Sequence, residues 1–119
     1  MIKKILILLV CLVAVTACSK EKKVSIPPEV IPPDQMVQVL VDFHLAEASL
    51  VQASLDQKNV DSLNNLYFYQ ILQKHQINYK KYNESLKFYS SNLEELHKIY
   101  GDVVSELSKT QTRIVSRNF

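Results

Sequence analysis

The sequence predicts an all-α protein, a small four-helix bundle or an orthogonal helical array, preceded by a signal peptide and a proline-rich tether. Two observations predict this fold class. Gly101 is the only glycine in the 119 residues, and all four prolines lie within residues 27–33. Glycine and proline form most of the tight turns that join strands. A chain with one glycine and no proline beyond residue 33 therefore favours helices with short connections.

The N-terminal 17 residues have the pattern of a signal peptide. A short basic start precedes an apolar run from Ile5 to Val15, which is too short to span a bilayer but fits a secretory signal. The step Ala17-Cys18 that follows is similar to a bacterial lipobox, in which the peptide is cut between these two residues. We therefore expect residues 1–17 to be removed and acyl chains on Cys18 to hold the mature chain on a membrane. An ordinary secretory signal with an incidental cysteine is the alternative.

Residues 18–33 are expected to form an extended tether that starts at the lipidated cysteine. The segment after Cys18 is charged at first and then rich in proline, a composition that favours polyproline II. At about 3.1 Å per residue, such a tether would hold the following domain, residues 34–119, up to roughly 45 Å from the membrane. Ser19, where an aspartate would favour the inner membrane, leads us to expect the outer membrane and its periplasmic face.

The mature chain should be electrically neutral. Removing the signal lowers the number of basic residues from 14 to 12, which balances the 12 acidic residues. A neutral chain gives no reason to expect nucleic acid as a partner. With a single glycine the chain also has no phosphate-binding loop, and we expect no cofactor.

The first helix is predicted over residues 34–55, because Pro33 and Asp34 suit a helix start. Its polar residues, Asp42 among them, form one stripe at helical spacing. The opposite side, within about 40° of its centre, carries Val37, Leu40, His44, Glu47 and Val51. We therefore expect His44 and Glu47 to point inward, among aliphatic side chains.

Three further helices are predicted at about residues 62–75, 79–90 and 92–114. Asp61 or Ser62 and then Asn78 are candidate N-caps, and Ser91 and Glu94 have the spacing of a capping box. Each segment has an apolar face, made of Leu63, Leu66, Tyr67, Ile71 and Leu72, then Tyr82, Leu86 and Tyr89, and finally Leu93, Leu96, Tyr100, Val103 and Leu107.

Several motifs of the helical part are similar to those of one family. They are the Asp42-x-His44-x-x-Glu47 motif, Ser85 ahead of the pair Phe88-Tyr89, and Tyr100 with Val103; Tyr82 stands where the family more often has phenylalanine. Over roughly residues 31–107, the chain resembles the small Bacteroidota lipoproteins grouped as domain of unknown function 4296. The resemblance implies a lipid-anchored helical protein and supplies no activity.

His44 and Glu47 are the candidate polar site, because residues three apart share a helix face. A Glu-x-x-His pair contributes to di-iron sites in helical bundles, but those sites need two such pairs and this chain has one, in reversed order. His75 and His97 are the alternative extra ligands of a zinc ion, although no metal-binding spacing connects them. The simplest interpretation is a buried or half-buried polar pair whose members are hydrogen-bonded to each other or to a tyrosine hydroxyl. We expect no metal ion and no catalytic residue.

Five aromatic residues form the candidate interface: Tyr67, Phe68, Tyr69, Phe88 and Tyr89. Consecutive residues point to different sides of a helix, so one small bundle cannot easily bury all five. Exposed aromatic side chains are enriched at protein interfaces. We therefore expect an aromatic face that docks another protein.

Asp61-Ser62-Leu63 is similar to the acceptor of O-glycosylation in Bacteroidota envelopes, with Ser62 as the modified residue. A plain helix cap is the alternative, because aspartate and serine favour that position. Together these features predict a non-enzymatic, membrane-anchored envelope protein with an envelope protein as partner. The alternative is a small-ligand or metal carrier centred on His44 and Glu47.

Overall fold

The computed structural model describes residues 1–4 and 23–117, and its globular part is built from four helices. These are α2 (Pro33–Leu55), α3 (Val60–Lys74), α4 (Tyr79–Ser90) and α5 (Leu93–Arg117). The described ranges contain no strand, so the all-α prediction is confirmed.

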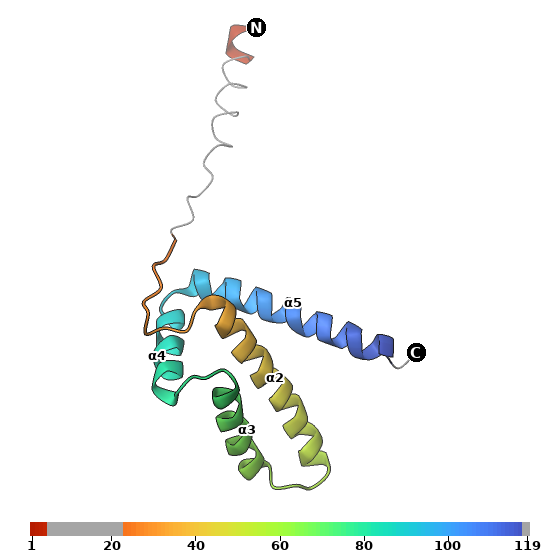
Figure 1. Ribbon diagram of the computed structural model, residues 1–119. Helices are drawn as coiled ribbons and strands as arrows, with labels where there is room; N and C mark the ends of the chain where they lie inside the picture. Colours follow the sequence, from red (N-terminus) through yellow and green to blue (C-terminus); the bar gives the residue numbers. More distant parts are fainter. Residues whose placement is uncertain (5–22, 118–119) are drawn as a thin grey trace.

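Helix α2 is the central element of the fold. It contacts α3 along one side and α5 along another, and α4 contacts α5. Figure 1 shows that α3 returns beside α2, whereas α5 starts near the beginning of α2 and then diverges from it. The helices therefore form an open array with its core where α2, α4 and α5 meet, and the paired α2 and α3 diverge from the far end of α5.

The core gathers apolar side chains from all four helices and from the segment before α2. Its most deeply buried members are Ile31, Met36, Val39, Tyr89, Ile99 and Val103. In the first half of α2, residues next to one another in the sequence are buried, because other helices cover this part of α2 on two sides. The sequence prediction assumed that only one side of this helix is covered. On that assumption Val51 was expected in the core, but the structure leaves this residue exposed.

The segment before α2 is part of the fold. Residues 24–32, the N-terminal strap, bury Val30 and Ile31, and the Ile31 side chain is 0 % exposed. The Ile31 N–H donates to Ser85 Oγ at 2.8 Å, and the Tyr89 hydroxyl donates to the Ile31 carbonyl at 2.6 Å. The predicted extended tether is therefore wrong for residues 30–33, which join the core and the start of α2. Burial of the two aliphatic residues between the proline pairs stabilises the packed segment, whereas an extended tether would leave both side chains in water.

The helix starts agree with the predicted caps in one case of three. Asn78 caps α4 by accepting the Lys81 N–H. Helix α3 is capped by Asn59, which accepts the Ser62 N–H, so the choice of Asp61 or Ser62 was wrong. The capping box at Ser91 is also wrong, because the Ser91 hydroxyl donates back to the Lys87 carbonyl at the end of α4.

Helices α2 and α3 end in the same unusual way. Gln57 and Gln76 follow them with φ values of 57° and 56°, in the left-handed region that favours glycine. In the second case, the Ile77 N–H bonds to the Leu72 carbonyl, and the Ile77 side chain is buried. This is the hydrogen-bonding pattern of a Schellman helix end, here built without glycine.

Candidate functional site

A groove runs between α2 and α3 and is the candidate functional site. Its volume is about 350 Å³, and it is open to solvent along its length. Leu45, Ala46, Tyr67 and Ile71 supply most of its apolar surface. Positions three or four apart along each helix share one face, which explains why residues 42, 45, 46 and 49 of α2 oppose residues 67, 70, 71 and 74 of α3.

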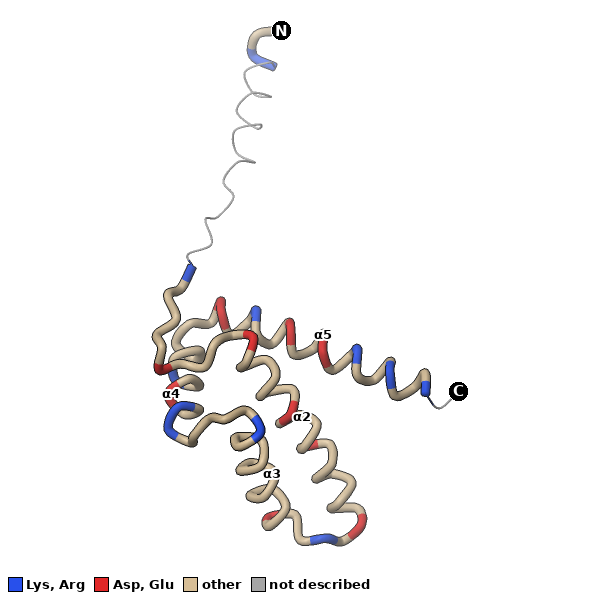
Figure 2. Tube along the Cα trace, viewed as in Figure 1, with Lys and Arg blue, Asp and Glu red and all other residues tan. Residues whose placement is uncertain are grey.

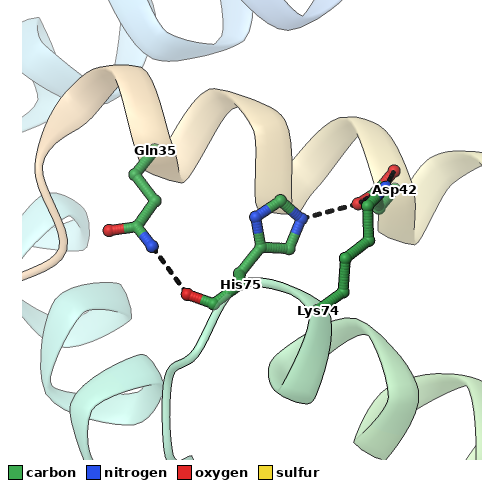
Figure 3. Close-up of polar contacts among 4 residues, drawn as sticks. All are labelled: Gln35, Asp42, Lys74 and His75. Carbon is green, nitrogen blue, oxygen red and sulfur yellow. Dashed lines mark hydrogen bonds and ion pairs between the residues drawn. The ribbon is translucent and has the colours of Figure 1, made fainter.

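A polar cluster closes one end of the groove (Figure 3). Asp42 Oδ2 lies 2.6 Å from His75 Nε2 and 2.7 Å from Lys74 Nζ. The Gln35 side-chain amide donates to the His75 carbonyl at 2.8 Å, so the end of α3 is held at two points along α2. These contacts fix the spacing of the two helices that form the groove.

The charge state of Asp42 depends on its partial burial and on its two partners, Lys74 and His75. Burial by itself would raise the pKa of this carboxyl group. The hydrogen bonds and positive charges that Lys74 and His75 supply outweigh burial, and the pKa of Asp42 lies below its ordinary value of 3.8. Asp42 is therefore an anion at neutral pH, and its charge is held in an ion pair with Lys74 at the end of the groove.

The sequence reasoning missed this cluster. It placed Asp42 in the solvent-facing stripe of its helix, whereas the structure covers that side with α3. Asp42 is 33 residues from His75, and pairing at such a distance leaves no periodic signal in the sequence. A hint was available in the composition of α2, because Asp42 is the only acidic residue in the largely apolar segment 36–46.

His44 and Glu47 do not point inward, so that prediction was wrong. Their side chains are 41 % and 72 % exposed, and His44 Nδ1 lies 3.2 Å from Glu47 Oε2. Helix α5 diverges from α2 before it reaches this level, which leaves the pair in solvent (Figure 1). The two side chains lie within hydrogen-bonding distance of each other, but as an exposed pair rather than a buried one. Neither residue lines the groove.

The five aromatic residues of the predicted interface do not form one surface. Tyr67 lines the groove, Tyr69 is 63 % exposed, and Phe68 and Phe88 are half-buried against the core. Tyr89 is fully buried, so its assignment to an interface was wrong. Its hydroxyl is occupied by the Ile31 carbonyl, which explains why this tyrosine is accommodated inside the core.

Phe68 is the centre of an aromatic cluster. Its ring centroid lies 5.5 Å from that of Phe43 and 5.9 Å from that of Tyr82, so the cluster joins α2, α3 and α4. Tyr69 and Tyr79 flank Phe68 at the exposed edge of this cluster. The aromatic residues of α3 and α4 thus serve mainly to attach these helices to α2, and less to form an outer face.

The remaining candidate residues lie apart from one another. His75 is engaged by Asp42, and His97 is exposed on α5. Within residues 1–4 and 23–117, no three metal-ligating side chains gather as a metal ion would require, and no helix has the length and apolarity needed to cross a membrane. Ser62 is exposed in the first turn of α3. Ala17 and Cys18 lie outside the described residues.

Comparison with known proteins assigns the chain to a family. The family model described as "Domain of unknown function (DUF4296)" matches residues 27–113, a range that includes most of the strap, the whole of α2, α3 and α4, and all but the last four residues of α5. No curated protein and no solved structure matches the chain. The match begins at Pro27, inside the N-terminal strap, as expected for a segment that is part of the fold. The chain belongs to the domain of unknown function 4296 family.

Proposed function

We propose that this protein is a lipid-anchored component of the bacterial cell envelope that docks another envelope protein through the α2–α3 groove. The observation that carries the proposal is the groove itself, an apolar channel with a charged cluster at one end. Apolar surface gives a partner binding energy, and the fixed charge of Asp42 orients it.

The apolar residues of the groove remain accessible to a partner. Leu45 is 40 % exposed, and the neighbouring Tyr67 offers both an aromatic ring and a hydroxyl group. Tyrosine is among the residues that dominate binding energy at protein interfaces. A partner that inserts one or two apolar side chains between α2 and α3 would cover both residues.

The anchor would keep this groove near the membrane surface. Because Ile26 is the first residue that packs against the core, residues 19–25 separate the lipidated Cys18 from the fold. At no more than about 3.6 Å per residue, these seven residues reach roughly 25 Å. This is little more than half of the distance expected for a tether that extends to residue 33. The partner should therefore present its binding segment close to the same membrane.

Lipid attachment is tested by metabolic labelling with palmitate and by the intact mass of the mature protein. We expect label on the native chain, a mass that begins at an acylated Cys18, and loss of both in a Cys18→Ala variant. Release of unlabelled native protein from washed membranes would contradict the anchor.

Docking is tested by crosslinking in intact cells, followed by purification of the lipoprotein and mass spectrometry. A Leu45→Lys variant places a charge in the groove, and Leu93→Lys makes the same change at an exposed position at the start of α5. We expect the partner to be lost with Leu45→Lys and kept with Leu93→Lys. Equal partner yields from both variants would contradict docking in the groove.

A small-ligand carrier remains the second candidate, since a volume of about 350 Å³ lies at the lower end of ligand pockets. The groove, rather than His44 and Glu47, would then be its site. The Leu45→Lys variant distinguishes the two functions. A carrier would bind its ligand as a purified protein and would lose that binding in this variant, and no protein partner would be crosslinked to either form.

A further inference from the structure

The diverging arms of α2 and α5 carry a second surface, on the side of α2 opposite the groove. We name residues 44–56 the acidic arm and residues 107–117 the basic arm. We infer that two copies of this chain associate by laying the basic arm of each copy on the acidic arm of the other. This inference is independent of the function proposed for the groove.

Each arm continues an apolar face that is buried nearer the core. On α2, Leu55 lies 18 residues, or five helical turns, after the buried Val37, and Val51 lies on nearly the same side. On α5, Ile114 lies 11 residues, close to three turns, after the buried Val103. The faces that hold α2 and α5 together at the core therefore extend along both arms.

These extended faces lack a cover because the two helices separate (Figure 1). Val51 is 64 % exposed, Leu55 74 % and Ile114 56 %. Where the helices part, a hollow is lined by polar residues, among them Gln38 of α2 and Glu106 and Lys109 of α5. A helix with an apolar face usually buries it against another element, and among residues 1–4 and 23–117, which the structure describes, no element covers these positions.

The charges of the two arms indicate that a second copy of the chain covers these faces. The acidic arm contains Glu47 and Asp56, with His44 beside Glu47, and residues 24–57 contain no lysine or arginine. The basic arm contains Lys109, Arg113 and Arg117 and no acidic residue. Figure 2 shows these opposite charges on the two diverging helices. One copy thus carries both halves of a complementary pair, as a two-fold symmetric dimer requires.

The ion pairs that these charges make within one chain do not prevent association with a second copy. Glu47 pairs with His44, Asp56 lies 3.6 Å from Lys58, and Lys109 lies 2.7 Å from Glu106. All of these pairs are substantially exposed, and exposed pairs contribute little to stability. Arg113 and Arg117 extend one and two turns beyond Lys109, on the part of α5 farthest from α2.

Intermolecular cysteine crosslinking of the full chain in cells tests the dimer. Two differently tagged copies are expressed together, one with Leu55→Cys and the other with Ile114→Cys, and treated with a short bismaleimide. We expect a product that carries both tags. Its yield should be about tenfold higher than for chains without an added cysteine, or for a pair with Leu93→Cys in place of Ile114→Cys. Position 93 is exposed on the same helix but lies at its other end.

Charge reversal makes the test specific. Arg113→Glu with Arg117→Glu should lower the crosslinked product about tenfold, and so should Glu47→Lys with Asp56→Lys. Chains that carry all four changes should regain it, because the reversed arms are again complementary. All four positions are exposed, so circular dichroism should report an unchanged fold for each variant.

Three results would overturn the inference. One is the absence of the doubly tagged product. Another is a product that is unaffected by charge reversal or not restored by the combined changes. The third is efficient crosslinking of Leu55→Cys to Ile114→Cys within a single chain that carries both, with no doubly tagged product, which would show that the arms close on each other.

Discussion

Removing one oxygen atom from Tyr89 should weaken the attachment of the N-terminal strap and the whole fold with it. In the Tyr89→Phe variant, the Ile31 carbonyl loses the hydroxyl group that donates to it at 2.6 Å. Both residues are 0 % exposed, so water cannot replace the lost donor without opening the core. An unsatisfied buried polar group costs about 1–3 kcal/mol. For a domain of this size, each 1 kcal/mol corresponds to roughly 4–8 °C in Tm.

Urea and thermal unfolding followed by circular dichroism would measure this loss, since the chain has no tryptophan for fluorescence. Tyr69→Phe removes the same atom from an exposed side chain and should leave stability within about 0.5 kcal/mol. Equal stabilities of the Tyr89→Phe and Tyr69→Phe variants would refute the reasoning that the strap is held by this bond.

The same residue gives an alkaline signature. Burial, followed by the nearby charge of Glu95, raises the pKa of Tyr89 to about 12, from about 10 in the unfolded chain. Because the folded-state pKa is the higher one, the stabilisation from the neutral phenol is complete below pH 10 and is lost as pH rises toward about 12. The Tyr89→Phe variant should lack this part of the alkaline transition, and an identical transition in both proteins would contradict the assignment.

Four further predictions concern other parts of the fold. Gly101→Ala should stabilise the protein by about 0.5–1 kcal/mol, because Gly101 is inside α5 and nothing lies within 4 Å of an added Cβ; a destabilised variant in urea unfolding would be inconsistent with that space. Asp42→Asn should lower stability at neutral pH by about 1–3 kcal/mol, since bonds to a charged group are lost. The wild type should lose that advantage only as pH falls below about 4, because the lowered pKa of Asp42 keeps its contribution intact above that value; a constant difference at pH 2–7 would argue against it. His44→Ala should change the free energy of unfolding by less than about 0.5 kcal/mol, as its side chain is exposed, whereas a loss of several kcal/mol would restore a buried role. Finally, the intact mass of the native chain should exceed the acylated mass by a glycan that disappears in Ser62→Ala, and an unmodified mass would end the glycosylation hypothesis.

The fold class could be predicted because it depends on local signals. Helical spacing of apolar residues and the near absence of glycine are visible within one window of sequence. The same reasoning failed at Gln57 and Gln76, where glutamine occupies a conformation that usually requires glycine. The only glycine, in turn, lies inside α5 rather than at a turn. The turns of this chain could therefore not be predicted, because the residues that form them are not typical turn residues.

The candidate site could not be predicted because it depends on contacts between distant residues. Asp42 and His75 are 33 residues apart, and Ile31 and Tyr89 are 58 apart. A helical wheel assumes that one side of a helix is buried, whereas α2 has partners on two sides near its start and on one side further along. That change along α2 explains both errors at this helix, the inward placement of His44 and Glu47 and the outward placement of Asp42.

The measurement that tests the central claim most directly is site-specific photocrosslinking from the groove in living cells. A photoreactive amino acid would replace Leu45, with replacement of Leu93 as the control at an exposed site away from the groove. The account predicts one envelope protein crosslinked from position 45, absent from position 93, and lost when Cys18→Ala removes the anchor. The same products from both positions, or products from position 45 that persist without the anchor, would contradict it.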